Sequence, residues 1–326
     1  MKKRPYRITG AIGLGAVMLI LTPIAAEALL GAWGTPVNVE SIAGTDASFN
    51  TPSTDGCPIQ SPDGLSFYMA SNRPGGLGGL DIWVATRATT DDPWGEPVNL
   101  GEPVNSTVDD FCPTPVRGGG LFFVSARSGG CGGPDIYFTR SNPKHGWLTP
   151  QNLGCQVNSA AGEAGPSLVT TEVGAGLYFS STRPGGFSSD AGSTGDADIY
   201  MSPLLVDGSF GAAVLVEGLN STYEDARPNV RKDGLEIVFD STQPGGFGAA
   251  DIYSASRSMT TAAWGTPVNL GSSVNTSSNE SRASLSWDGL TMYFGSNRPG
   301  SELALDGVTV SNDIYVTTRQ RIAGGG

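Results

Sequence analysis

Five carboxylates recur at one position of a repeated sequence pattern, where they could form a cation site. Each follows an asparagine by five residues and, except in the last copy, precedes a proline by three: Asp55, Asp110, Glu163, Asp225 and Glu280. Calcium prefers carboxylate oxygens, so it is the cofactor that a ring of these residues would hold. We favour a structural alternative, in which each carboxylate accepts hydrogen bonds from backbone amides or a nearby arginine, because one site seldom needs five equal copies.

Other candidate ligand-binding residues depart from the repeat. The spacing from the arginine of each Ser-x-Arg segment to the next Asp-Ile pair is 8 residues in copies one and two and 15 in copies three and five. The longer copies carry Asp190, Asp196 and Asp306, which could ligate calcium or hold a polar ligand; plain loop elaboration is the alternative. Arg227 and Arg282 replace small or neutral residues of the other copies, and could neutralise the carboxylates or contact an anionic group.

The sequence offers little for nucleophilic catalysis. Its single histidine, His145, lies in a Pro-Lys-His-Gly turn, and no nucleophile-elbow sequence accompanies it. A Ser-His-Asp or Cys-His arrangement would have to be built on this residue. We therefore expect His145 to be an exposed turn residue and assign no catalytic residues.

Four cysteines favour an oxidising compartment. Cys57 and Cys112 occupy the same repeat position, whereas Cys131 and Cys155 lie in two loops that emerge on one face of an up-and-down blade. Of the three possible pairings we favour Cys57 with Cys112 and Cys131 with Cys155. A zinc site is the rival interpretation, but there is no Cys-x-x-Cys pair to support it.

The elements that position these residues belong to a unit repeated five times. Its asparagines are separated by 55, 53, 62 and 55 residues: Asn50, Asn105, Asn158, Asn220 and Asn275. A fixed period of this size in a chain with 47 glycines and 22 prolines indicates one supersecondary unit copied along a solenoid or a propeller.

Each period predicts four antiparallel strands, the size of a propeller blade. An Asp-Gly turn follows the first strand in three copies, a hairpin signal. The second strand is rich in aromatic and β-branched residues and should be half-buried. The third opens with Asp-Ile-aromatic, at Asp81, Asp135, Asp198, Asp251 and Asp313. The fourth is expected to begin at Trp94, Trp147, Phe210 or Trp264.

The two ends of the repeat region predict a closed ring. The last copy stops after its third strand, and the missing fourth strand occurs before the first copy, at residues 33–38. If this segment completes the last sheet, no terminal edge stays open to aggregation. The sequence therefore predicts an all-β fold, a five-bladed β-propeller that spans residues 29–320 as one domain.

Residues 1–28 are predicted to be a signal peptide. A basic stretch at 2–7 precedes an apolar run at 8–21, and Ala26 and Ala28 mark a small-x-small cleavage site. A signal anchor is the alternative, but the apolar run is short for a bilayer span of about 20 residues. We expect a periplasmic or secreted protein without stable membrane insertion after cleavage, and a flexible tail at residues 321–326.

Net charge removes one class of partner. The 326 residues include 19 basic and 31 acidic ones, a formal net charge of -12. Without the leader, which holds four basic and one acidic residue, the net charge is about -15. Such a surface repels phosphate backbones, so nucleic acid is not an expected partner. The expected partner is an envelope or extracellular protein or glycan.

The motifs together resemble the Pro-Asp-type propeller repeat of TolB-like proteins and of the propellers found beside OmpA-like domains. The likeness rests on Ser-Pro-Asp-Gly at 61–64, Ser-Asn-Arg-Pro-Gly-Gly at 71–76, Asp-Ile-Trp at 81–83 and Trp-Gly-Glu-Pro-Val-Asn-Leu-Gly at 94–101, and on their counterparts in the other copies. It implies an exported, non-catalytic propeller that binds or scaffolds. Five blades instead of six, and no N-terminal α/β domain, set the chain apart from TolB itself and put a role in the Tol system in doubt.

A carbohydrate-active enzyme is the alternative function, because arabinanase-type glycosidases also use five-bladed propellers. Such enzymes need unequal carboxylates about 5 to 10 Å apart in the channel. The five repeated acids are equivalent, and the segments that follow them contain none: 58–61, 113–116, 166–169, 228–231 and 283–286. We therefore expect a binding module that recognises its ligand through the face bearing the connectors between blades.

Overall fold

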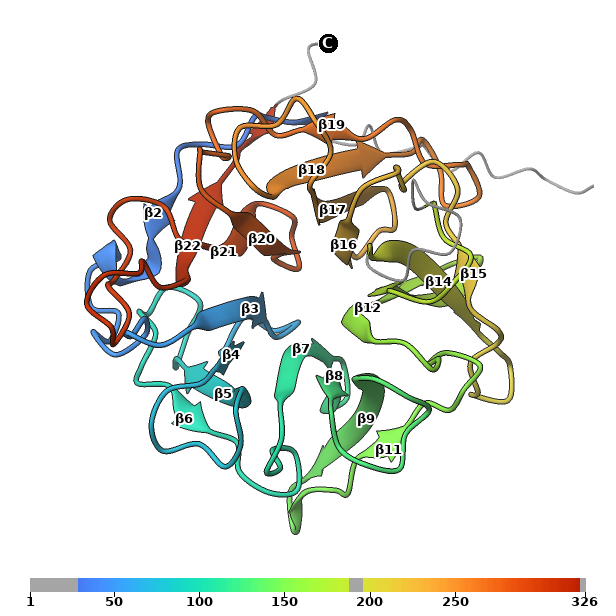
Figure 1. Cartoon of the computed structure of the whole chain (residues 1–326), viewed down its shortest axis with the longest axis horizontal. Coiled ribbons are helices and arrows are strands. Elements are labelled where there is room, and N and C mark those ends of the chain that lie inside the picture. The colour runs from blue at the N-terminus through green and yellow to red at the C-terminus, as the bar shows by residue number, and fades with distance from the viewer. Residues whose placement is uncertain (1–28, 188–195, 323–326) are drawn as a thin grey trace, which may run out of the picture.

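The chain forms a closed ring of five blades around a central channel (Figure 1). The computed structural model describes residues 29–187 and 196–322. No helix in these two ranges has the length and hydropathy of a membrane-spanning segment. The prediction of a five-bladed propeller with four antiparallel strands per blade is confirmed.

Each blade runs outward from an inner strand at the channel to a short outer strand. Blade 1 contains β3 (Asp55–Gln60), β4 (Ser66–Ser71), β5 (Asp81–Thr86) and β6 (Val98–Asn99). Blade 2 contains β7 (Asp110–Val116), β8 (Gly120–Ser125), β9 (Asp135–Asn142) and β11 (Gln151–Asn152), with β10 (Gly146–Trp147) also paired to β9. Blade 3 contains β12 (Glu163–Thr171), β13 (Gly174–Ser181), β14 (Asp198–Leu204) and β15 (Val214–Leu215). Blade 4 contains β16 (Asp225–Val230), β17 (Glu236–Ser241), β18 (Asp251–Ser256) and β19 (Val268–Asn269). Blade 5 contains β20 (Glu280–Leu285), β21 (Thr291–Ser296), β22 (Asp313–Thr318) and β2 (Val37–Asn38).

The second strands are more deeply buried than the sequence suggested, which corrects the half-buried expectation. Every residue of β8 and β17 is buried, because neighbouring blades cover both faces of a middle strand. This is why their apolar runs do not alternate with polar residues. Equivalent positions of the five second strands hold fully buried side chains: Met69, Phe123, Phe179, Phe239 and Phe294.

The outer strands are shorter than predicted. β6 has two residues, and Trp94, which was expected to open it, lies outside the ladder. Trp94 is instead 2% exposed and packs against Phe67 with ring centroids 5.3 Å apart. The tryptophan of the repeat therefore serves the core between blades.

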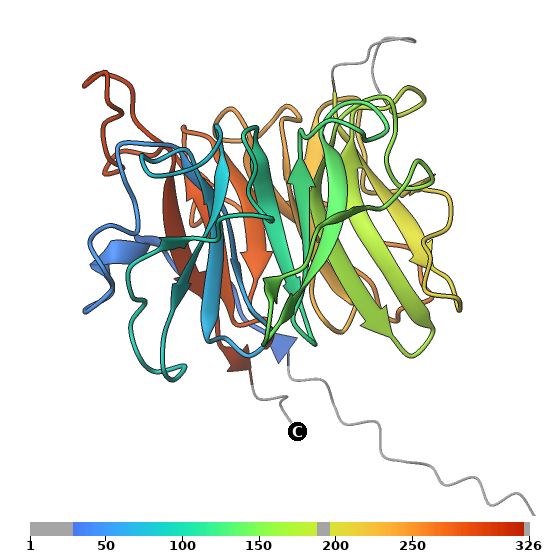
Figure 2. The same ribbon diagram turned by 90° about the horizontal axis from the view of Figure 1, so that it is seen from below.

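The N-terminal strand closes the ring, as predicted. β2 pairs with β22 and is followed by the short 3-10 helix η1 (Val39–Ser41). Arg321 and Ile322, which we had placed in the tail, form β23 (Arg321–Ile322) and pair with β1 (Leu29–Leu30). Both ends of the described chain therefore lie on one side of the ring (Figure 2).

The two sides of the ring differ in the loops that they carry (Figure 2). The connectors between blades and the loops from second to third strands form one side, the connector face. The hairpins from first to second strands, together with β1 and β23, form the other, which we name the hairpin face.

Both expected disulfides form. Cys57 and Cys112 join the inner strands of blades 1 and 2, with Cα atoms 4.8 Å apart. Cys131 and Cys155 join a loop of blade 2 to the connector that leaves it, with Cα atoms 5.6 Å apart. Blade 2 thus takes part in both covalent links.

One asparagine per blade attaches each connector to the preceding blade, and all of them are buried except Asn220, which is half-buried. The side chain of Asn105 accepts a hydrogen bond from the Ile82 amide and donates one to the Ile82 carbonyl, both at 2.9 Å. Three other pairs repeat this arrangement: Asn158 with Ile136, Asn220 with Ile199, and Asn275 with Ile252. Asn50 bonds in the same way to Ile314, 264 residues away, so ring closure uses the same contact.

Replacing one of these asparagines should destabilise the fold strongly. Asn105→Ala leaves the Ile82 amide unpaired in the core, which costs about 1 to 3 kcal/mol. It also removes the bonds from Asn105 to Asn99 and to the Ile82 carbonyl, which keeps its bond from the Leu100 amide, and each lost bond adds about 0.5 to 1.5 kcal/mol. We expect the free energy of unfolding, measured in urea, to fall by about 2 to 5 kcal/mol. Asn72 is exposed, and water can replace its bond to the Thr54 amide, so Asn72→Ala should cost less than about 1 kcal/mol. Equal losses in the two variants would contradict this role.

Glu40, in the helix η1 that follows the ring-closing strand β2, makes the stability of the fold depend on pH. Burial, assisted by repulsion from Glu302 and Asp313, raises the pKa of Glu40 from 4.5 to about 7, although the amide of Asn50 opposes the shift. The folded state therefore binds this proton more tightly than the unfolded state, and stability falls as pH rises from about 4.5 through 7. Glu40→Gln should weaken the fall in melting temperature between pH 5.5 and pH 8. The exposed Glu217→Gln is the control; an unchanged pH profile in Glu40→Gln would refute the assignment.

Candidate functional site

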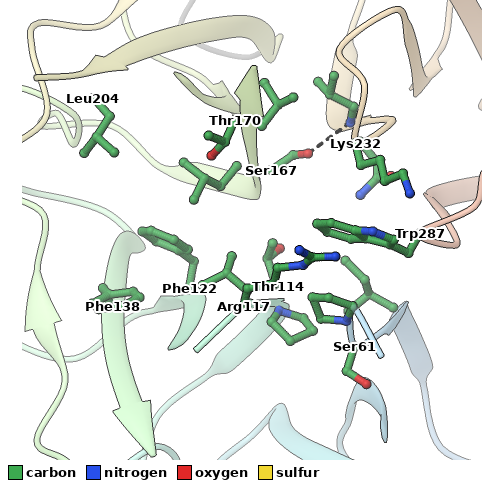
Figure 3. A pocket seen from close by; sticks show the side chains of 18 of the residues that line it. Ser61, Thr114, Arg117, Phe122, Phe138, Ser167, Thr170, Leu204, Lys232 and Trp287 are labelled. Carbon is green, nitrogen blue, oxygen red and sulfur yellow. Dashed lines mark hydrogen bonds between the residues drawn. The ribbon is translucent and has the colours of Figure 1, made fainter. Parts of the chain in front are cut away.

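A large cavity opens on the hairpin face at the mouth of the channel (Figure 3). It has a volume of about 1040 Å³ and lies between the C-terminal ends of the five inner strands, extending outward between blades 2 and 3. We name it the hairpin-face cavity. Its size suits a small-molecule ligand.

Five side chains from one repeat position border the cavity, and all five differ. The position is the seventh after the repeated carboxylate, at or just beyond the end of each inner strand: Pro62, Arg117, Thr170, Lys232 and Trp287. The asparagine, carboxylate and Asp-Ile positions hardly change from blade to blade. A position with five residue types is therefore not part of the shared architecture.

Trp287 lies between two cations at the rim of the cavity, as Figure 3 shows. Arg117 comes from blade 2, with its guanidinium carbon 4.6 Å from the indole centre, and Lys232 comes from blade 4, with Nζ at 5.4 Å. Tryptophan attracts cations best among the aromatic rings, by about 0.5 to 1 kcal/mol at an exposed site. Since the indole is 37% exposed, three blades present accessible side chains at one place.

An apolar recess forms the part of the cavity between blades 2 and 3. The ring of Phe122 contacts those of Phe138 and Phe210, at centroid distances of 4.7 and 6.0 Å. Leu168 and Leu204 complete the wall. Phe138, Phe210 and Leu168 pack against the buried core of these blades yet stay partly exposed. The recess therefore presents apolar surface to whatever enters the cavity.

Positive charge dominates the lining. Arg117, Arg140 and Lys232 border the cavity, and among the described residues that do so there is no aspartate or glutamate. The acids of the adjoining turns accept hydrogen bonds from amides of their own turns: Asp63, Asp233 and Asp288. The cavity is thus lined by three basic side chains in a chain whose formal net charge is -12.

A narrow throat closes the inner end of the cavity. A bulge in each inner strand holds one residue in the left-handed region, with φ between 47° and 60°: Cys57, Cys112, Gly165, Arg227 and Arg282. The space between them is about 30 Å³, room for one or two water molecules. The cavity is therefore blind.

Arg227 lies in this throat and binds acids that the sequence reasoning had not considered. Its Nε is 2.9 Å from Oδ2 of Asp240, and its Nη2 is 3.2 Å from Glu224. Burial lowers the pKa of Arg227, but the charge of Asp240 and its hydrogen bonds outweigh this and raise it. Arg227 thus neutralises Asp240 and not the repeated carboxylates.

Arg282, the other predicted anion contact, is the less satisfied of the two. Its backbone amide donates to Asp240 at 2.9 Å, but its guanidinium forms no hydrogen bond within the described ranges of the chain. Burial, and then repulsion by Arg227, lowers the pKa of Arg282 to about 10. A signal for Asp240 existed in the sequence, since the equivalent positions of the other blades hold small or apolar residues: Ala70, Val124, Ser180 and Gly295.

The five repeated carboxylates are buried separately, each in its own blade. Asp55 accepts from the Thr51 amide at 2.7 Å and pairs with Arg73 at 2.5 Å. Equivalent ion pairs join Asp110 to Arg127, Glu163 to Arg183 and Glu280 to Arg298; Asp225 accepts from Ser221. No group of three or more Asp, Glu, His or Cys among residues 29–187 and 196–322 could hold a metal ion. A calcium site stays a prediction that these contacts do not support.

The two described aspartates of the longer loops, Asp196 and Asp306, lie in different blades. Asp190 lies outside the described residues. Asp196 is half-buried in blade 3, whereas Asp306 is exposed in blade 5 and accepts hydrogen bonds from the Val308 and Thr309 amides of its own turn. Asp306 borders a groove of about 480 Å³ on the connector face, between blades 5 and 1.

Comparison with known proteins identifies the fold and nothing narrower. No protein-family model matches the sequence, and no curated protein matches it. The structure is similar to the alpha-L-arabinofuranosidase from Podospora anserina in complex with cellotriose, at 11% identity and a TM-score of 0.56, over 90% of this chain and 98% of that chain. It is also similar to the endo-arabinase from Bacteroides thetaiotaomicron, at 16% identity and a TM-score of 0.53, over 89% and 99% of the two chains.

A TolB structure matches more weakly. TolB from Acinetobacter baumannii is 15% identical, with a TM-score of 0.46, over 89% of this chain and 64% of that chain. This score carries no family assignment. The chain is a five-bladed propeller that shares its fold with glycoside hydrolases, without the sequence identity that would carry their activity to it.

Proposed function

We propose that the protein is a binding module that holds its ligand in the hairpin-face cavity and catalyses no reaction there. The observation that carries this proposal is the cavity itself, in which Trp287, Arg117 and Lys232 converge beside an apolar recess. Ligand sites typically combine an apolar lining with a few directed polar groups. The ligand is thus expected on the hairpin face, and not on the connector face that the sequence favoured.

Glycosidase activity is the second candidate, because the arabinofuranosidase and the endo-arabinase have a similar fold. A glycosidase needs an acid and a second carboxylate about 5 to 10 Å apart around the scissile bond. Asp240 and Glu224 both bind Arg227, which lines the throat. The free space of the throat, about 30 Å³, is too small for a sugar ring. We therefore favour binding without turnover.

A ligand screen paired with a hydrolysis assay separates the two candidates. A ligand at 100 times its Kd stabilises the folded state by about 2.7 kcal/mol, so a cavity ligand should raise the melting temperature of the protein measurably. We expect Trp287→Ala to lose this gain. Tyr223→Ala is the control, because Tyr223 is an exposed aromatic that does not line the cavity.

Two results would count against a binding module. If ligands stabilise Trp287→Ala as well as the wild type, they bind elsewhere. If arabinan, xylan or an aryl glycoside is hydrolysed and the turnover disappears in Glu224→Gln, the protein is a glycosidase that uses the throat.

We also propose that residues 1–28 direct export and that the ligand or partner is an envelope or extracellular component. Both disulfides support this, since such bonds persist in oxidising compartments. When residues 1–326 are expressed in a Gram-negative host, the processed protein should appear in the periplasmic or culture fraction. It should begin at residue 29 and contain no free thiol. Deletion of residues 2–28 should leave four reactive thiols in the cytoplasm. An uncut chain in the membrane fraction would instead establish a signal anchor.

A further inference from the structure

We infer that the hairpin-face cavity binds an amphiphilic anion, a small molecule that joins one carboxylate or comparable anionic group to one alkyl or aryl group. This inference rests on the proposed function, and adds to it the chemical class of the ligand. Two parts of the cavity carry it, the cationic rim and the apolar recess.

The cations of the rim lack counter-ions. Within the described parts of the chain, none of the three cations that line the cavity forms an ion pair: Arg117, Arg140 and Lys232. Acids are abundant, at 31 against 19 basic residues, and the arginines of the blade interiors are paired with them. Unpaired cations gathered in one cavity of such a chain are available to an anionic ligand.

The indole of Trp287 helps to hold two of these cations in place. Arg117 and Lys232 approach it at 4.6 and 5.4 Å from different blades. A cation over a ring face keeps its N–H groups free to donate to another partner, since the ring takes up the charge without accepting them all. A guanidinium held this way can donate two parallel hydrogen bonds to a carboxylate. The rim therefore places donors before the ligand arrives.

The recess lies close enough to the rim for one small molecule to occupy both. Val116, which also lines the cavity, precedes Arg117 directly, and Figure 3 shows Phe122 and Phe138 beyond Arg117 on the side away from Trp287. Burial of an alkyl or aryl group against these rings removes apolar surface from water on both partners. The anionic end of the same molecule would then meet Arg117 and Lys232.

Other ligand classes use only part of this arrangement. An inorganic anion would leave the apolar recess empty. A neutral sugar would leave the cations without a partner, and a cation would be repelled by them. A polymer threaded through the channel is excluded, because the throat has only about 30 Å³ of free space.

Three ten-carbon probes that differ in charge test the inference by calorimetric titration of the disulfide-bonded protein. They are decanoate, the neutral decyl maltoside and the cationic decyltrimethylammonium, each below its micelle concentration. We expect decanoate to bind at least about tenfold more tightly than either of the others. Added salt should lower the affinity for decanoate, because salt screens the charges of an exposed rim.

Two variants with matched controls locate the binding. The double variant Arg117→Gln/Lys232→Gln should lower the affinity for decanoate about tenfold. Its control is Lys144→Gln, which should leave the affinity unchanged, because Lys144 is exposed on the same face outside the cavity. Leu204→Glu places an acid in the recess wall and should also lower the affinity for decanoate. Its control is Val206→Glu, because Val206 is fully exposed in the adjacent turn. All five substituted positions are exposed, so the variants should fold.

The possible failures are distinct. If decyl maltoside or decyltrimethylammonium binds as tightly as decanoate and Leu204→Glu weakens it, the cavity is a binding site, but the anionic class is wrong. If the double variant binds decanoate like the wild type, the rim does not recognise the anion and the inference falls. If no probe binds and the ligand screen also yields nothing sensitive to Trp287→Ala, the proposed function falls with it.

Discussion

The buried asparagine between blades is the contact on which the rest of the structure depends. Its side chain bonds to both backbone groups of an isoleucine in the preceding blade, and so fixes where the next inner strand begins. In blade 2 the carboxylate of Asp110, five residues after the asparagine, accepts a hydrogen bond from the Ser106 amide. Arg127, the arginine of the Ser-x-Arg segment, binds this carboxylate and also donates to the Val104 carbonyl of the connector. In blades 1, 2, 3 and 5 an arginine thus engages the repeated acid, whereas blade 4 has Gln243 at that position and Asp225 binds Ser221 instead. Contacts made within single blades do not support a cation site shared by the five acids.

The throat shows how one geometry can be filled in different ways. All five inner strands hold a residue at positive φ, a conformation that costs a non-glycine residue about 1 to 3 kcal/mol. Blade 3 uses Gly165, whereas blades 1 and 2 use Cys57 and Cys112, which are linked covalently. Blades 4 and 5 use Arg227 and Arg282, whose backbone or side chain binds Asp240. The same backbone conformation narrows the channel in all five blades. The side chains determine only whether a disulfide, a glycine or an arginine occupies the throat.

The sequence predicted what repetition and local chemistry determine. Strand number, ring closure and both disulfides followed from the period, from the displaced strand at residues 33–38 and from the placement of the cysteines. Full burial of β8 did not follow, since it depends on the blades on either side. Asp240 was missed because its partner Arg227 lies on another strand. Nor could the sequence show that the carboxylate of Asp306 accepts hydrogen bonds within its own turn. The seventh repeat position was visible as a variable one, but only the ring brings Arg117, Lys232 and Trp287 together.

The position of the cavity has a physical explanation in the same architecture. Connectors must join two blades, so their residues are committed to the inter-blade network, whereas a hairpin turn is attached only to its own blade and can vary. Blades 2 and 3 both contribute to the recess, and their interface leaves Phe138 and Phe210 partly exposed. An incompletely filled core costs stability, and a disulfide offsets such a loss by restricting the unfolded chain. Both disulfides involve blade 2. The proposed cavity ligand would cover the apolar surface that this interface leaves exposed.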